Sequence, residues 1–170
     1  MKIIFGNNVL TLRNVKQDIS HDETLYVSSA DVVLNRKKIG TYREDFWSGP
    51  PIIDIISNKE LLQEIAEKFL KQYPQGVLPL MGAKTYDLTE LYKEDEIEGL
   101  LSEMVGIHCN IEQTIKKILK SYPIAVIAKD NQRALEQFWK VSNEETMKNF
   151  EDKIVVMKAY KDKENFTFEV

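Results

Sequence analysis

The residues best suited to chemistry in this 170-residue chain are concentrated between positions 40 and 51. This segment combines three aromatic with three charged side chains and ends in the rigid bend Gly49-Pro50-Pro51. Aromatic rings supply large, rigid contact areas, and charged groups supply directional hydrogen bonds. Such a combination is typical of a surface that binds another molecule. We therefore predict a binding site made of Tyr42, Arg43, Glu44, Asp45, Phe46 and Trp47.

A structural role is the alternative for the two aromatic residues next to the bend. Phe46 and Trp47 could fill the end of the core where a strand turns towards the first helix, because aromatic side chains are more often buried than exposed. The bend would then only mark the end of the strand. Exposed rings favour the binding site, and rings deep in the core exclude it.

The residues around this segment also resemble a hairpin pattern of small uncharacterised proteins of phages and other mobile elements. The pattern consists of a basic turn and the sequence Lys-Ile-Gly at 35–40, followed by an acidic, aromatic bend with a glycine at 42–50. The resemblance covers a short part of the chain and implies no known activity. It implies an accessory or inhibitor protein that acts by binding.

A second group that could do chemistry is the adjacent pair His108-Cys109. A thiolate beside an imidazolium is an activated nucleophile. Neighbouring residues in a regular element point apart, so this pair could act together only within a turn. We interpret Cys109 as a partly buried cysteine at a helix junction and predict no catalytic residues. Because His21 is the other histidine, a zinc site would need carboxylates to complete it, and we predict neither a metal nor a cofactor.

Acidic residues form a third group. Asp45, Asp54 or the acidic run at 90–98 could bind a divalent cation through oxygen ligands, but the EF-hand spacing of glycine and glutamate is missing. A charged run of this kind is typical of the solvated face of a helix. The alternative is that the run mimics a nucleic-acid backbone and occupies a basic groove on a target protein, which would suit an inhibitor.

Basic residues cluster at 36–38 and at 116–120. The formal net charge is −4, from 23 Lys and Arg against 27 Asp and Glu, so no overall basic field attracts phosphate backbones. No glycine-rich phosphate loop occurs, which excludes a P-loop nucleotide hydrolase and a Rossmann dehydrogenase. Nucleic-acid binding is a disfavoured alternative, and it requires convergence of Arg36, Lys37, Lys38, Lys116 and Lys117.

Length and composition indicate a folded protein. A chain of 170 residues with 43% hydrophobic content can bury one substantial core, so we predict a single domain over 1–170 with a sub-boundary near 75–86. The single cysteine indicates a reducing compartment. No apolar run is long enough for a signal peptide or a membrane span. We expect a soluble, cytoplasmic protein without a membrane partner.

Strand-forming residues dominate the first third of the chain. Segments 2–5 and 9–15 are rich in β-branched residues and are separated by Gly6-Asn7-Asn8, which predicts a hairpin. Segments 25–34 and 39–43 predict a second hairpin around a polar turn. The bend Gly49-Pro50-Pro51 is expected to end the sheet, because proline donates no ladder hydrogen bond.

Helical periodicity dominates the middle of the chain. Apolar residues recur every three to four positions, and glycine or proline follows the periodic runs. A capping box at Ser57 with Glu60 is expected to start the first helix, and Gly106 is expected to separate the second from the third. The predicted helices cover 57–73, 87–106, 110–122, 131–140 and 144–150.

Strands return at the end of the chain. A short buried strand is predicted at 124–128, and alternating residues at 154–160 and 166–170 predict a closing hairpin. Hairpins, then helices, then strands predict an α+β fold. Its core is expected to be a mainly antiparallel sheet built from hairpins, with about four to five helices packed on it.

The leading interpretation of function is a small binding protein. It would contact a protein partner through the second hairpin and the bend, without a cofactor. The first alternative is a hydrolase or transferase that uses Asp45 or Asp54 with His108 in a pocket between sheet and helices. We favour the binding protein because the chain lacks a recognisable set of catalytic residues.

Overall fold

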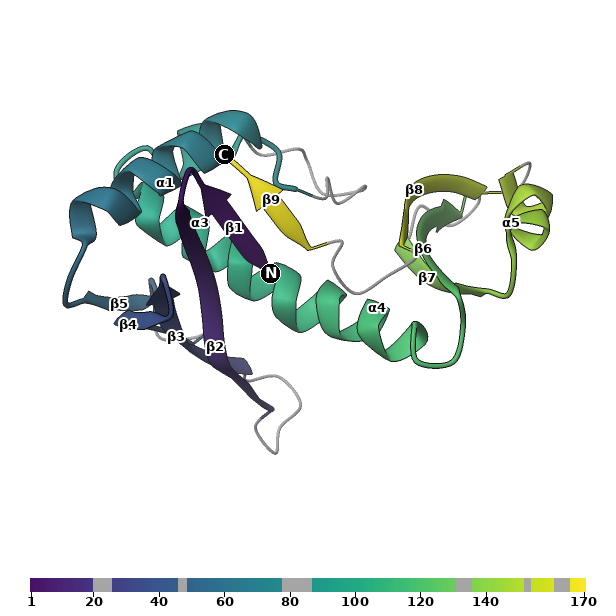
Figure 1. Cartoon of the computed structure of the whole chain (residues 1–170), viewed down its shortest axis with the longest axis horizontal. Helices are drawn as coiled ribbons and strands as arrows, with labels where there is room; N and C mark the ends of the chain where they lie inside the picture. Colours follow the sequence, from purple (N-terminus) through teal and green to yellow (C-terminus); the bar gives the residue numbers. More distant parts are fainter. Residues whose placement is uncertain (20–25, 46–48, 78–86, 131–135, 152–153, 161–165) are drawn as a thin grey trace.

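The computed structural model describes residues 1–19, 26–45, 49–77, 87–130, 136–151, 154–160 and 166–170 (Figure 1). The strands are β1 (Lys2–Phe5), β2 (Asn8–Ile19), β3 (Tyr26–Leu34), β4 (Lys37–Asp45), β5 (Ile52–Ile55), β6 (Ile124–Asp130), β7 (Glu136–Val141), β8 (Ile154–Tyr160) and β9 (Thr167–Glu169). The helices are α1 (Lys59–Gln72), α2 (Leu88–Leu91), α3 (Glu96–Gly106), α4 (Gln113–Ile118) and α5 (Glu144–Glu151), with a π-helical segment η1 (Ile107–Glu112) between α3 and α4.

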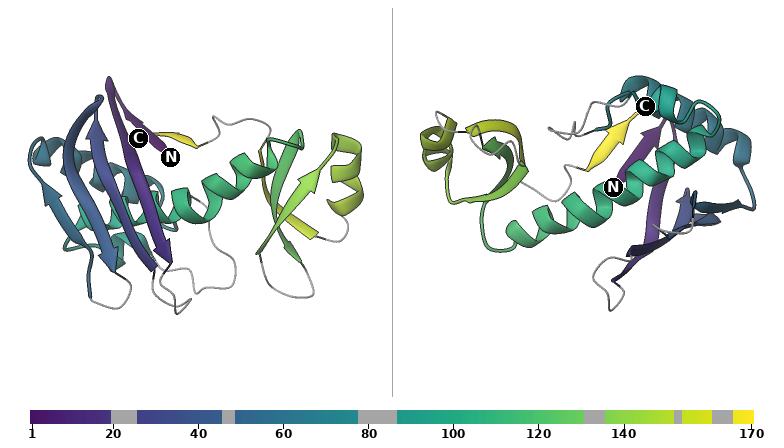
Figure 2. Two further views of the ribbon diagram at one scale, coloured as in Figure 1. Left: turned by 90° about the horizontal axis from the view of Figure 1, so that it is seen from below. Right: turned by 180° about the vertical axis from the view of Figure 1, so that it is seen from behind.

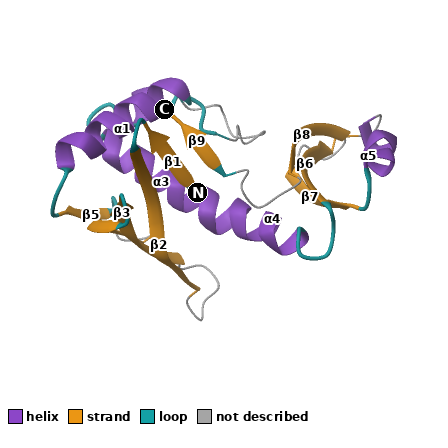
Figure 3. Cartoon of the chain, in the orientation of Figure 1, coloured by secondary structure: helices purple, strands orange, loops and turns teal. Residues whose placement is uncertain are grey.

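The strands form two sheets (Figure 3). One has six strands in the order β5-β4-β3-β2-β1-β9, and the other has three in the order β7-β6-β8. Neighbouring strands are antiparallel except for β1 and β9, which are parallel. The predicted α+β fold with a mainly antiparallel sheet is confirmed, as are the first two hairpins.

Helices α1 and α3 cover one face of the six-stranded sheet, and no described helix covers the other (Figure 2). Helix α1 packs there because its apolar residues recur every three to four positions and so form one stripe. Side chains from α1, α3 and the inner face of the sheet make the larger core. Its fully buried members include Ile3, Leu10, Val32, Leu62, Phe69, Leu100 and Met104.

A second group of buried residues joins α4 to the three-stranded sheet and to the end of the chain. Ile115 of α4, Ile127 of β6 and Phe166 belong to it. Phe168 of β9 also belongs to it and makes an edge-to-face contact with Tyr73, with ring centroids 5.9 Å apart. Residues 78–86 lie outside the described part of the chain, so the boundary predicted near 75–86 stays a prediction.

The prediction of one continuous helix over 87–106 is wrong, because this segment forms two helices, α2 and α3. Asp87 opens only the single turn α2, and α3 starts at a cap of its own. The backbone of Asp95 is extended there, with φ −151° and ψ 81°, and its side chain accepts a hydrogen bond of 3.0 Å from the amide of Glu98. Helix α2 ends at Leu91 with Tyr92 as its C-cap, and Asp95 caps α3 as a separate helix.

The predicted break at Gly106 is also wrong. Gly106 has helical φ and ψ of −57° and −48°, and the chain continues through η1 into α4. A π-helical segment holds one extra residue in its turn, which is how this junction differs from a plain α-helix. The proposed start of a new helix at Asn110 falls inside this continuous rod.

Three predictions about strands need correction. Part of the helix predicted over 131–140 is strand β7, and residues 131–135 lie outside the described part of the chain. The closing hairpin is wrong, because β8 pairs with β6 whereas β9 pairs with β1 in the other sheet. The sheet does not end at Gly49-Pro50-Pro51, because β5 follows the prolines as an edge strand, a position where proline does not interrupt a ladder.

Candidate functional site

The six residues predicted to form the binding site have different surroundings. Tyr42 is 1% exposed and lies in the core. Arg43 is exposed, and Glu44 and Asp45 are half-buried. Phe46 and Trp47 lie outside the described residues. Arg43, Glu44 and Asp45 are therefore the candidates for a surface site at the end of β4, and the ring of Tyr42 belongs to the core.

Tyr42 joins the sheet to α3 through its hydroxyl group. The hydroxyl donates a hydrogen bond of 2.7 Å to Oε2 of Glu44 and lies 3.2 Å from Oγ of Ser102. Burial raises the pKa of Tyr42 well above its usual range, and the neighbouring Glu44 raises it further. The phenol stays protonated at neutral pH, so this group positions Glu44 and does not act as a base.

Strand β5 forms one edge of the six-stranded sheet and carries exposed apolar side chains. Ile52, at its start, and Ile56, just after it, are each 70% exposed. The strand pairs with β4 on one side, with Ile52 opposite Arg43, and has no strand partner among the described residues on the other. Its outward backbone N–H and C=O groups are thus open to another chain, which is unusual for an edge that carries large apolar residues.

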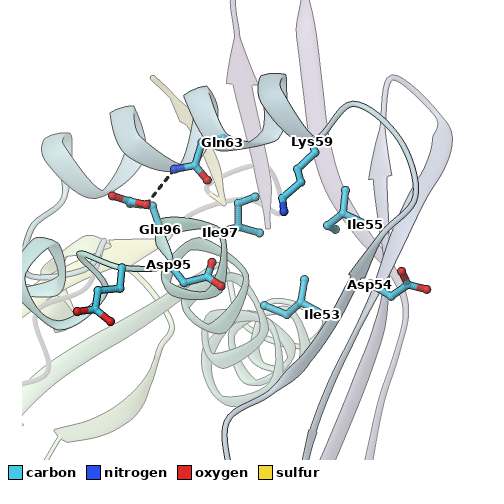
Figure 4. A pocket seen from close by; sticks show the side chains of 9 residues that line it. Ile53, Asp54, Ile55, Lys59, Gln63, Asp95, Glu96 and Ile97 are labelled. Carbon is cyan, nitrogen blue, oxygen red and sulfur yellow. Dashed lines mark hydrogen bonds between the residues drawn. The ribbon is translucent and has the colours of Figure 1, made fainter.

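A pocket of about 400 Å³ opens beside this edge, between β5, the start of α1 and the turn before α3 (Figure 4). Ile53, Ile55 and Ile97 form its apolar wall. Its polar residues are Asp54, Lys59, Gln63, Glu94, Asp95 and Glu96.

Charge around the pocket is mostly negative, because Glu94, Asp95 and Glu96 accompany a single lysine there. The carboxylate of Asp54 points away from the helices on the far side of β5 (Figure 4). Lys59 extends into the pocket from α1 (Figure 4). Glu96 is fixed by a hydrogen bond of 2.9 Å from Nε2 of Gln63, and Asp95 is fixed by its capping bond. A rigid, acidic and partly apolar cavity of this kind fits a long side chain that ends in a positive charge, namely lysine or arginine.

The residues of the enzymatic alternative are not gathered in this pocket. Asp54 lines it, but His108 belongs to η1, where its Nδ1 lies 3.0 Å from Oε2 of Glu112. Burial raises the pKa of the Cys109 thiol, and the negative charge of Glu44 raises it further. An activated cysteine needs the opposite shift, so His108-Cys109 lacks the character of a nucleophile.

Glu112 is a buried acid that sequence reasoning missed. Its side chain is 6% exposed and contacts the amine of Met1, Nζ of Lys116 and the ring of His108. The spacing of four residues between His108, Glu112 and Lys116 was a usable signal, but the contribution of Met1 depends on the fold. This cluster ties the start of the chain to η1.

Two of the lysines proposed for nucleic-acid binding are already paired with acids. Nζ of Lys38 lies 2.5 Å from Oδ1 of Asp31, and Lys116 contacts Glu112. The described residues contain no group of three His, Cys, Asp or Glu arranged to hold a metal ion. Within the same residues, no helix has the length and apolar character needed to cross a membrane.

No known protein family, curated protein or solved structure matches this chain.

Proposed function

We propose that the protein binds an extended segment of a partner protein along β5. The segment would add a strand to the sheet through backbone hydrogen bonds, which is a common mode of peptide recognition. One observation carries the proposal: an open strand edge, two isoleucines that are each 70% exposed and an acidic pocket occur together at β5. No cofactor is required for this activity.

The pocket supplies the specificity of the proposed interaction. A strand beside β5 would place alternate side chains towards the helices, where Asp95 and Glu96 line the cavity. A lysine or arginine at such a position would exchange water for carboxylate partners. Ile52 and Ile56 would cover apolar side chains of the same segment, and their exposed surface is the source of affinity.

A library of random peptides displayed on phage tests this proposal directly. Peptides selected on the immobilised protein should alternate β-branched with basic residues. The affinity of the best synthetic peptide is then measured by calorimetry for the wild type and for Ile52→Lys/Ile56→Lys. We expect the variant to bind at least tenfold more weakly, because two new charges repel the basic segment and remove the apolar contact.

Two further variants sharpen the test. Asp95→Asn/Glu96→Gln removes two pocket charges, and asparagine at position 95 can still cap α3, so the helix should persist while peptide affinity falls. Tyr122→Lys is the control for a new charge at an exposed apolar residue. Tyr122 is 38% exposed and does not line the pocket, so this variant should leave peptide affinity unchanged. Selected peptides without basic residues, or equal affinity for all variants, would contradict the proposal.

The end of β4 belongs to the same proposed surface. Arg43 lies opposite Ile52, and Trp47 lies in the sequence between β4 and β5. We expect Arg43→Ala/Trp47→Ala to abolish peptide binding while the circular dichroism spectrum keeps its native shape. Binding that survives in this double variant would confine the site to β5 and the pocket.

A further inference from the structure

A second groove lies on the face of the six-stranded sheet that no described helix covers. Leu10 and Leu12 of β2 face the core, so the alternate residues Val9, Thr11 and Arg13 project to the opposite face. These three residues form the floor of a groove of about 490 Å³ that ends at the β3–β4 turn. It is separate from the pocket beside β5, which shares none of its residues.

Every charged residue that lines this groove is positive. Lys2 projects to the same face as Thr11, its partner in the β1–β2 register, and Arg13 and Arg36 complete the set. No ion pair holds any of the three within the part of the chain that the structure describes. The groove therefore concentrates positive charge in a protein whose net charge is −4.

The acid that lies across from Arg13 has other partners. Asp31 lies opposite Arg13 in the register of β2 and β3. Its carboxylate accepts a hydrogen bond of 2.7 Å from Nδ2 of Asn14, and its other oxygen lies 2.5 Å from Nζ of Lys38. The hydrogen bond from Lys38, followed by that from Asn14, lowers the pKa of Asp31. Both carboxylate oxygens of Asp31 thus have partners other than Arg13. The guanidinium group of Arg13 can therefore donate hydrogen bonds to a ligand.

Arg36 is held at the mouth of the groove by a strained turn. Asn35 and Arg36 have φ of 50° and 69°, the left-handed geometry of a type I′ hairpin turn, and glycine is preferred at the second position. The side chain of Asn35 fixes the turn with two hydrogen bonds of 2.8 Å. Its Oδ1 accepts one from the amide of Val9, and its Nδ2 donates the other to Oδ1 of Asn8. Arginine at a position that favours glycine costs stability, and strained positions of this kind cluster at binding sites.

We propose that this groove binds phosphate groups of a ligand that carries at least two of them. Arginine matches phosphate oxygens with paired hydrogen bonds, and two arginines lie towards opposite ends of the groove. The four-residue step from Val9 to Arg13 spans about 13 Å at about 3.3 Å per residue, which is longer than one phosphate group. Among the described residues, no aromatic side chain lines the groove, so recognition rests on the phosphates and not on stacked bases. A free polyphosphate and a nucleic-acid backbone both offer this chemistry.

Calorimetry with inorganic tripolyphosphate at low salt tests the proposal with the variant Arg36→Gly. Glycine relieves the strain of the turn, so the melting temperature should stay equal or rise. The arginine donors are lost, so affinity should fall at least tenfold. Lys71→Ala removes one exposed positive charge from α1 and should change affinity less than twofold. Unchanged affinity of Arg36→Gly, or equal losses in both variants, would overturn the proposal.

A second measurement identifies the source of the phosphates. Binding of a duplex oligonucleotide of mixed sequence is measured over a salt series, in the wild type and in Arg36→Gly. Tighter binding than tripolyphosphate, a steep salt dependence and a loss in Arg36→Gly would assign the groove to a nucleic-acid backbone. Tripolyphosphate binding alone would assign it to a small polyphosphorylated ligand. Failure of both anions to bind would refute the phosphate site.

Discussion

Gly40 of β4 lies directly against the backbone of Asp54 in β5. A Cβ at position 40 would clash with the carbonyl oxygen of Asp54 and stand 2.7 Å from Cδ1 of Ile55. The absence of a side chain at Gly40 therefore lets β5 pair with the rest of the sheet at this distance. We predict that Gly40→Ala destabilises the protein by about 2 kcal/mol, because the clash is with backbone and cannot relax.

Urea unfolding of Gly40→Ala and Gly106→Ala measures this effect against a matched control. A Cβ on Gly106 would meet nothing within 4 Å, and its backbone is helical. Alanine there should stabilise the protein by about 0.5 to 1 kcal/mol. Equal changes in the free energy of unfolding of the two variants would show that β4 and β5 can move apart to accommodate a side chain at position 40.

Glu112 should be the most important single acid for stability. Burial alone would raise its pKa, but hydrogen bonds from His108, Lys116 and the Met1 amine outweigh burial and hold the pKa well below its usual range. Glu112→Gln breaks a buried ion pair, which costs about 3 kcal/mol. Urea unfolding at neutral pH measures this loss.

The control for this variant is Glu64→Gln. Glu64 has the same four-residue relation to Lys68, at 3.9 Å, but both side chains are exposed, so we expect a loss below about 0.5 kcal/mol. A loss of similar size in both variants would mean that burial adds nothing to the Glu112 cluster.

The same carboxylate predicts a pH dependence. Its folded pKa is depressed, so its stabilisation is complete above the unfolded pKa of about 4.3 and is lost as the pH falls towards the folded pKa. Below about pH 4.3, the free energy of unfolding should therefore decrease more steeply for the wild type than for Glu112→Gln. Parallel curves in acid titrations of the two proteins would contradict the depressed pKa.

Glu103 should give stability a pH dependence opposite to that from Glu112. Burial raises its pKa, and the hydrogen bond from the amide of Val77, 3.0 Å long, lowers it by less. The folded state then retains a proton that the unfolded chain loses, so stability falls as the pH rises above about 4.3. Glu103→Gln keeps an acceptor for Val77 and removes the charge.

We expect the stability of Glu103→Gln to rise relative to that of the wild type as the pH rises from about 4 to about 7, because the wild type must ionise a buried carboxyl group. Thermal unfolding across this pH range gives the difference. Glu60→Gln, at an exposed acid on α1, is the control for the substitution itself. If the difference in stability between Glu103→Gln and the wild type did not change with pH, burial would not disfavour the charge of Glu103.

The hydroxyl of Tyr42 should contribute to stability and not to binding. Tyr42→Phe removes the bond to Glu44 and the contact with Ser102, which we expect to cost about 1 to 2 kcal/mol because one partner is charged. Peptide affinity should stay within about twofold, since the ring lies in the core. Tyr122→Phe, at a partly exposed ring, is the control for the loss of a phenol and should change stability by less than about 0.5 kcal/mol.

Local patterns predicted the elements that depend on neighbouring residues. The helix expected over 57–73 is α1, and the helix expected over 144–150 is α5. The capping box predicted at Ser57 with Glu60 is wrong, because the N-cap of α1 is Asn58, which has left-handed geometry and makes no side-chain cap hydrogen bond. The first turn of α5 is held by Asn143, whose Oδ1 accepts a hydrogen bond of 2.7 Å from the amide of Thr146.

Features that depend on distant residues were beyond sequence patterns. The apolar spacing of 131–140 is helical, but part of that segment pairs with β6 as β7, because tertiary pairing overrides local propensity. The edge strand β5 follows two prolines that read as a stop signal. The pocket joins Asp54 to Glu94 and Asp95, about forty positions later, and no local pattern connects such residues.

The parallel pairing of β1 with β9 determines how the molecule would respond to mechanical force. Pulling Met1 and Val170 apart draws these neighbouring strands along each other in opposite directions. The hydrogen bonds from Lys2 to Phe166 and from Val170 to Ile4, 2.8 and 3.0 Å long, would then carry the tension together instead of opening one after another. A protein held by its two ends would therefore resist extension in shear, and the short ribbon between its first and last strands would act as a clamp.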